Sequence, residues 1–139
     1  MLATDVSYDP HALPGDVVAF LAERHLGTLT TLRPDGSPHV VPVGFSFDPV
    51  TRAVRIICSE GGRKVRNIDA GSRAVVCQVD GARWVSLEGP AVVLRRPDEI
   101  DDAAERYGSR YQAPRVNPNR VAIRIDVDRI LGNGGKRSR

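Results

Sequence analysis

Residues 26–47 read LGTLTTLRPDGSPHVVPVGFSF, and this stretch predicts a β-hairpin. The first arm is rich in β-branched residues, which favour strands. PDG at 34–36 is a turn sequence, since proline presets its backbone angle and glycine accepts a positive φ. The second arm continues to Phe47 with further valine and phenylalanine. A hairpin of this length favours a β-rich fold, and the flanking segments extend it.

Four more strands are expected after the hairpin. They are 52–59 (RAVRIICS), 73–79 (RAVVCQV), 83–95 (RWVSLEGPAVVLR) and 120–131 (RVAIRIDVDRIL). We expect the long strand to bend at Gly89-Pro90, because proline cannot donate to a ladder and glycine weakens a strand interior. The last strand alternates most regularly, with apolar side chains at 121, 123, 125 and 127. The sequence therefore predicts six strands, mostly antiparallel, with short connections.

Helices are expected at 15–25, from about Arg63, and at 97–111. Six strands with these helices predict a mainly β fold, a small antiparallel β-barrel that is closed or half-closed. Three regions are expected along the chain: a flexible leader at 1–13, the barrel domain at 14–132, and a disordered basic tail at 133–139.

The composition fits one globular domain of 139 residues, 41% hydrophobic and 27% charged. No apolar run approaches the roughly 20 residues of a membrane span, and the N-terminus lacks a secretion signal, so we expect a cytoplasmic protein that binds no membrane. The net charge of +3 equals the charge of Lys136, Arg137 and Arg139 in the tail. A body near neutrality argues against a nucleic-acid partner.

The most informative segment for function is 59–67, SEGGRKVRN, where a strand ends and a helix begins after two glycines. Free backbone N–H groups at a helix start attract anions, whereas cations normally favour the opposite end. The positive charges of Arg63 and Lys64 at a helix start are therefore unfavourable unless an anion is bound there. The alternative interpretation, a solvated basic turn, stays open at this point.

Other residues suggest no catalytic machinery. His39 stands alone without a serine or acid placed to form a triad, and no paired carboxylates or zinc-type spacing occur. Cys58 and Cys77 lie in apolar runs, which favours buried reduced thiols. Trp84 is interpreted first as core, and second as a contact to a planar ligand. The residues predict no metal site and no catalytic side chain, but a protein that binds an anionic ligand able to bring its own reactivity.

The order of these segments resembles the split β-barrel superfamily of pyridoxamine 5′-phosphate oxidase-like flavin and deazaflavin proteins. The resemblance extends from about residue 14 to 132 and is strongest to the actinobacterial coenzyme F420-dependent branch. FLAERHLGTLTTLRPDGSPHVVPVGFSFDP, QVDGARWVSLEG and RYGSRYQAPRVNPNRVAI look like the F420H2-dependent biliverdin reductases in particular. The resemblance implies a six-stranded split barrel of the FMN-binding type and an intertwined homodimer with cofactor sites at its interface.

Site residues are implied by position in the same resemblance. Arg63 and Lys64 match a pair that grips the cofactor phosphate, and Ile57 and Cys58 match the strand end that lines the site. The backbone along the cofactor ring corresponds to His39, Val40, Val41, Pro42 and Val43. Trp84 falls where FMN-using oxidases have a glutamine that touches the flavin, and an indole cannot copy an amide.

The resemblance also implies the reaction. Reduced F420 would give a hydride to a planar conjugated acceptor, in the first place biliverdin, and produce bilirubin. Biliverdin carries two propionates, so arginines near the site are candidate clamps, namely Arg106, Arg110, Arg115 and Arg120. Two alternatives remain: an FMN-dependent enzyme of the oxidase type, and a non-catalytic protein that carries F420.

Overall fold

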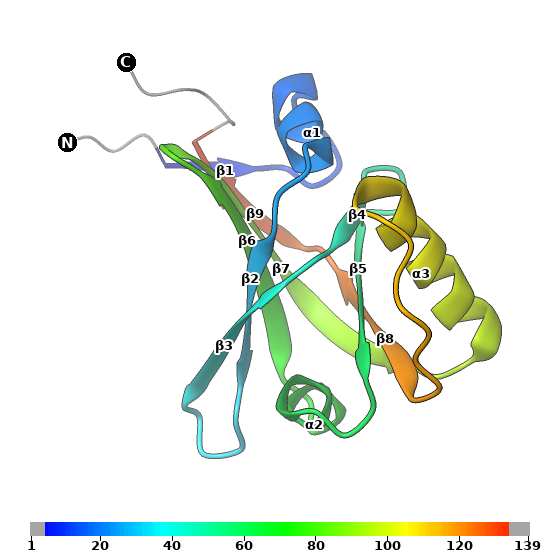
Figure 1. Cartoon of the computed structure of the whole chain (residues 1–139). Helices are drawn as coiled ribbons and strands as arrows, with labels where there is room; N and C mark the ends of the chain where they lie inside the picture. The colour runs from blue at the N-terminus through cyan, green and yellow to red at the C-terminus, as the bar shows by residue number, and fades with distance from the viewer. Residues whose placement is uncertain (1–4, 134–139) are drawn as a thin grey trace.

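The computed structural model describes residues 5–133, which form one antiparallel sheet with three flanking helices (Figure 1). The predicted mainly β class is confirmed. The helices are α1 (Gly15–Ala22), α2 (Arg63–Asp69) and α3 (Pro97–Arg110). The strands are β1 (Val6–Tyr8), β2 (Gly27–Leu32), β3 (Pro38–Val43), β4 (Ser46–Asp48), β5 (Ala53–Ser59), β6 (Arg73–Asp80), β7 (Arg83–Leu94), β8 (Arg120–Asp126) and β9 (Arg129–Gly132).

The strands follow one another across the sheet in the order β3-β2-β6-β7-β8-β5-β4, while β9 pairs with β7 and β1 pairs with β9. Every neighbouring pair is antiparallel. The two ends of this order, β3 and β4, are consecutive in the chain and separated only by Gly44 and Phe45. The chain thus passes directly from one end of the strand order to the other, which gives the sheet its split-barrel form.

The long strand β7 changes its partner near the bend predicted at Gly89-Pro90. Its first part pairs with β6 up to Pro90, and residues from Ala91 onward pair with β8. Glycine is required at position 89, because a Cβ there would lie 1.9 Å from the carbonyl oxygen of Asp126. A single strand can therefore serve both parts of the sheet.

Residues 5–133 contain nine strands where the sequence predicted six, and two of the three additional strands arise because two predicted strands are each divided. The expected second arm of the hairpin is interrupted at Gly44 and Phe45, and β4 pairs with β5 instead of β2. The expected strand at 120–131 is interrupted at Val127 and Asp128. The N–H groups of these two residues donate to the carbonyls of Arg52 and Glu88, so the chain leaves one partner and joins another. An alternating apolar pattern does not reveal such a change of partner.

The third additional strand lies inside the predicted leader of residues 1–13. β1 pairs with β9 from Val6 opposite Gly132 to Tyr8 opposite Ile130, so this part of the leader is bound to the sheet. Its short run of three residues carries too weak a pattern to be recognised alone. Residues 1–4, and 134–139 of the predicted basic tail, lie outside the described residues.

The core fills the concave side of the sheet, and helices cover its ends. α1 contributes Val17, Phe20 and Leu21 to the main apolar cluster, and α2 contributes Val65 and Ile68. Figure 1 shows these helices at opposite ends of the strands, while α3 lies beside β5 and β8. None of the helices in residues 5–133 is long and apolar enough to cross a bilayer. The end of α3 lies beside β4 and the end of α1 (Figure 1), where Arg110 donates to the carbonyl of Glu23.

Candidate functional site

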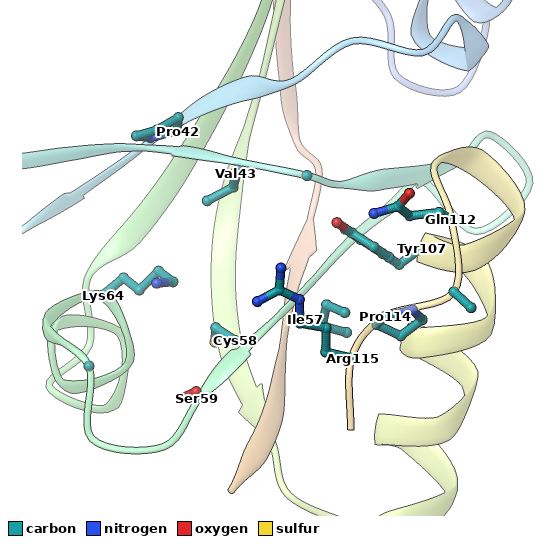
Figure 2. A pocket seen from close by; sticks show the side chains of 13 residues that line it. Pro42, Val43, Ile57, Cys58, Ser59, Lys64, Tyr107, Gln112, Pro114 and Arg115 are labelled. Atoms are coloured by element: carbon teal, nitrogen blue, oxygen red, sulfur yellow. The ribbon is translucent and has the colours of Figure 1, made fainter. Parts of the chain in front are cut away.

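A cavity of about 550 Å³ lies between the β3–β4 junction, the end of β5, the start of α2 and the segment that follows α3 (Figure 2). Each of these four parts contributes to its wall. The lining residues are Pro42, Val43, Gly44, Ile57, Cys58, Ser59, Gly62, Lys64, Tyr107, Gln112, Ala113, Pro114 and Arg115.

Half of the predicted cofactor residues line this cavity. Pro42 and Val43 come from β3, Ile57 and Cys58 from β5, and Lys64 from α2. They are distant in sequence, and the crossing of the chain at Gly44 and Phe45 brings β3 next to β5. The structure therefore collects these side chains in one place, and the predicted substrate residue Arg115 joins them.

Lys64 supplies the positive charge on one side of the cavity. α2 begins at Arg63 after Gly62, so the lysine lies in the first turn as predicted. Its side chain extends from α2 toward the cavity in Figure 2 and forms no ion pair within residues 5–133. Arg115 adds a second cation on the opposite side. Since no carboxylate from the described residues lines the cavity, its electrostatics favour an anionic ligand.

His39 experiences the charge of Lys64 but does not line the cavity. It stands opposite Thr31 on β2, and its Nδ1 is buried without a hydrogen-bond partner in the described structure. Desolvation lowers the pKa of His39 below its usual 6.5, and the charges of Arg33, Lys64 and Arg63 lower it further. The imidazole is therefore neutral at pH 7. Arg63, the first residue of α2, does not line the cavity.

The other predicted β3 residues have separate surroundings. Val41 packs against the main apolar cluster, whereas Val40 points to the opposite side of the sheet and is 55% exposed. This alternation is the normal period of a strand. Pro42 shares the face of Val40, yet it lines the cavity together with Val43 because both residues lie at the end of β3.

Cys58 is a half-buried free thiol in the cavity wall. Burial raises the pKa of this thiol, and the nearby Lys64 charge opposes that effect only in part. The thiol is therefore protonated at neutral pH and a weak nucleophile. Cys77 is also free and half-buried.

Trp84 lies away from the cavity. It is the second residue of β7 and stands opposite Val79, and its backbone N–H donates to Oδ1 of Asn133 at 3.1 Å. The cavity wall described above does not include it. Contact of Trp84 with a cofactor stays a prediction, because within one chain Trp84 does not reach the cavity.

The structure separates the four arginines predicted to hold the substrate. Arg115 lines the cavity, while Arg120 donates to the backbone carbonyl of Arg115 from outside it. Arg106 forms ion pairs with Asp102 and Asp48. Of the four, only Arg115 is thus placed to meet a ligand in the cavity.

Arg110 binds several groups within the chain, and its contact with a substrate stays a prediction. Its guanidinium donates to the carbonyl of Phe45 at 2.5 Å, to the carbonyl of Glu23 at 2.6 Å, and to Oε1 of the fully buried Gln78 at 2.5 Å. It also lies over the Phe45 ring, 4.4 Å from the centroid. Burial lowers the pKa of Arg110, but the surrounding acceptors satisfy its donors. The residue fixes the β3–β4 junction to α1 and β6.

Tyr107 and Gln112 were missed by the sequence prediction. Figure 2 shows both side chains directed into the cavity, from α3 and from the segment after it. Tyr107 packs on Gly44, where a Cβ would lie 2.6 Å from Cε2 of the tyrosine. The spacing of Tyr107 and Tyr111, four residues apart, places both rings on one helix face and was the available signal. Nothing local to α3 indicates which strand this face meets.

Comparison with known proteins agrees with the fold. Residues 13–133 match the family profile of pyridoxamine 5′-phosphate oxidase. A protein of Mycobacterium tuberculosis (strain CDC 1551 / Oshkosh), an F420H(2)-dependent biliverdin reductase, is 54% identical over 121 residues, 87% of this chain and 88% of that protein.

Solved structures with low sequence identity share the fold. A structure described as an F420 reductase superposes with a TM-score of 0.70 at 24% identity, covering 85% of this chain and 98% of its own. A putative pyridoxamine 5′-phosphate oxidase from Listeria innocua gives a TM-score of 0.68 at 18% identity, covering 84% and 95%. The predicted split-barrel fold is confirmed by these structures. The chain therefore belongs to the pyridoxamine 5′-phosphate oxidase family.

Proposed function

We propose that this chain is a coenzyme F420-dependent reductase that transfers a hydride from the reduced cofactor to biliverdin and produces bilirubin. The observation that carries the proposal is the identity of 54% to the M. tuberculosis biliverdin reductase over almost the whole of both chains. At this level two proteins share their fold. The cavity described above supplies a place for the cofactor.

The residues of the cavity fit F420. The cofactor combines a flat deazaflavin ring with a phosphodiester and an acidic glutamate tail. The backbone and side chains at 42–44 and at Ile57 form a largely apolar wall for a ring, and Lys64 and Arg115 supply positive charge for the acidic part. Charge-assisted hydrogen bonds of this kind contribute about 1.5–3 kcal/mol each.

The protein contributes binding and orientation to the reaction. Bound reduced F420 supplies the hydride. The β3–β4 junction, held by Arg110 and Tyr111 at Phe45, gives the ring a fixed wall. Placing donor and acceptor carbons about 3–3.5 Å apart and excluding water is then the main catalytic task. This division of labour explains why the chain needs no nucleophile of its own.

We also propose that the chain works as a homodimer. The register places Thr28, Thr30, Val40 and Val79 on the sheet face opposite the core, and both valines are 55% exposed. Trp84 stands opposite Val79 and shares this face. A second copy that covers the face would bury these apolar side chains and bring Trp84 close to a partner, as the predicted interface site requires. Light scattering of the purified chain at micromolar concentration tests this, with twice the chain mass of 15.1 kDa expected.

A binding titration with F420 and FMN separates the proposed cofactor from its alternative. We expect saturable binding of F420 and much weaker binding of FMN. Purified protein that carries tightly bound yellow FMN and ignores F420 would instead support an FMN-dependent enzyme. Tight F420 binding without oxidation of F420H2 by biliverdin would support a carrier protein.

A further inference from the structure

A second cavity, of about 250 Å³, adjoins the one described above. It lies between the link from α1 to β2 and the end of α3, and Tyr107 and Gln112 belong to the walls of both cavities. Its other lining residues are Arg24, His25, Leu26 and Tyr111. The two cavities therefore form neighbouring compartments with one shared wall.

The second cavity offers an aromatic and apolar surface that is held rigidly. The rings of Tyr107 and Tyr111 lie 4.9 Å apart at 41°. The Tyr111 hydroxyl donates to the His25 carbonyl at 2.6 Å and accepts from the Phe45 N–H at 3.1 Å, which fixes its ring. Leu26 beside them is 60% exposed. Such a preformed surface suits a flat conjugated ligand, since aromatic contacts need little reorganisation.

Arg24 provides a positive charge at this cavity that the protein itself does not neutralise. The nearby carboxylates of Glu23 and Asp80 both bind the guanidinium of Arg83, and Glu23 also accepts from the His25 ring. Arg24 is exposed, lines the cavity and has no ion pair among residues 5–133. The acids behind the cavity are thus occupied, and the Arg24 guanidinium is available to a carboxylate from outside.

We propose that the second cavity binds a carboxylate-bearing part of the hydride acceptor, with Arg24 as the anchor and Tyr107 and Gln112 as the wall across which the acceptor extends. This inference rests on the proposed function. A linear tetrapyrrole that receives the hydride at its central methine carbon must extend in both directions from the cofactor ring. The first cavity, filled by the cofactor, cannot enclose the whole acceptor. The adjoining cavity offers both the aromatic surface and the cation that a propionate-bearing end requires.

The test is the variant Arg24→Gln, which keeps polarity and removes the charge. We expect KM for biliverdin to rise about 10-fold or more, as loss of one charge-assisted contact implies, with a smaller effect on kcat. The affinity for F420 should stay within twofold of the wild type. A second readout is equilibrium titration of biliverdin into protein that holds oxidised F420, where the dissociation constant should rise by a similar factor.

Two controls make the result specific to a carboxylate. Arg96→Gln removes a charge from an exposed position outside both cavities and should leave KM unchanged. Biliverdin dimethyl ester lacks the charged groups, so the wild type and Arg24→Gln should bind it equally. An Arg24→Gln enzyme with wild-type KM for biliverdin overturns the inference and leaves the proposed function intact. If the wild type oxidises no F420H2 with biliverdin, the proposed function fails, and this inference fails with it.

Discussion

Gly44 connects the fold to the site more directly than any charged residue, and its replacement by alanine gives a sharp prediction. Gly44 follows β3 and lines the larger cavity, and the ring of Tyr107 packs against it. An alanine Cβ would lie 2.6 Å from Cε2 of Tyr107 and 3.2 Å from Cε2 of Tyr111. Ordinary van der Waals contact begins at 3.4 Å, so Tyr107 must move by nearly 1 Å.

The structure limits how that displacement can be accommodated. The neighbouring Phe45 backbone is held by Arg110 and by the Tyr111 hydroxyl, so the strand cannot simply move away from α3. Overpacking of this kind costs about 1–3 kcal/mol of unfolding free energy. For a chain of this size the melting temperature should fall by about 3–10 °C. Because Tyr107 belongs to both cavity walls, KM for the acceptor should rise as well.

The assay is urea unfolding of four proteins: wild type, Gly44→Ala, Tyr107→Ala and the double variant. Gly44→Ala should lower the unfolding free energy much less in the Tyr107→Ala protein than in the wild type. The difference between these two losses measures the steric conflict between the alanine Cβ and the Tyr107 ring. Gly15→Ala is the matched control, because a Cβ at that position meets no atom within 4 Å. A Gly44→Ala protein as stable as the wild type would refute the packing argument.

Three further predictions concern charged groups. Lys64→Ala should weaken F420 binding by about 5- to 150-fold and reduce the salt dependence of binding, because one charged contact is lost. A fluorescence titration measures the dissociation constant, and an unchanged value would mean that the cofactor does not bind beside Lys64. Arg110→Ala should lower the unfolding free energy by about 2–4 kcal/mol, since several buried acceptors lose their donor; urea unfolding with no measurable loss contradicts the structural role. Contact with Arg83 lowers the pKa of Glu23 from 4.5 to about 2. The ion pair between Glu23 and Arg83 therefore stabilises the fold fully above pH 4.5, and this stabilisation disappears as the pH falls toward 2. Arg83→Gln should therefore lose less stability between pH 7 and pH 3 than the wild type does, and equal losses would argue against the pair.

The sequence predicted the elements that depend on local pattern. Residues 26–43 form the hairpin, α3 begins at Pro97 as expected, and β7 changes partner at Gly89-Pro90. These features follow from turn residues and periodicity, which a few neighbouring positions determine. The interruption at Gly44 does not, since valine, glycine and phenylalanine there continue an ordinary strand pattern. Only packing of Tyr107 and Tyr111 against that point explains why the chain turns away from β2.

Only part of the candidate site could be predicted, because the rest of it depends on tertiary contacts. Lys64 was named from its charge at a helix start, and Ile57 and Cys58 because their motif resembles a known family; the structure places all three in one cavity. The four arginines could not be distinguished in advance, because Arg110 and Arg115 are chemically equivalent in the sequence. Tertiary contacts assign Arg110 to the backbone of Phe45 and leave Arg115 at the cavity. A sequence pattern indicates which groups are present, whereas their partners depend on the folded chain.

Anaerobic mixing of the purified protein with F420H2 and biliverdin tests the central claim most directly. The visible absorbance of both compounds should change together, with one oxidised F420 formed for each bilirubin, and omission of the protein should abolish the change. F420H2 that stays reduced beside unchanged biliverdin, in the presence of protein shown to bind the cofactor, would contradict the account.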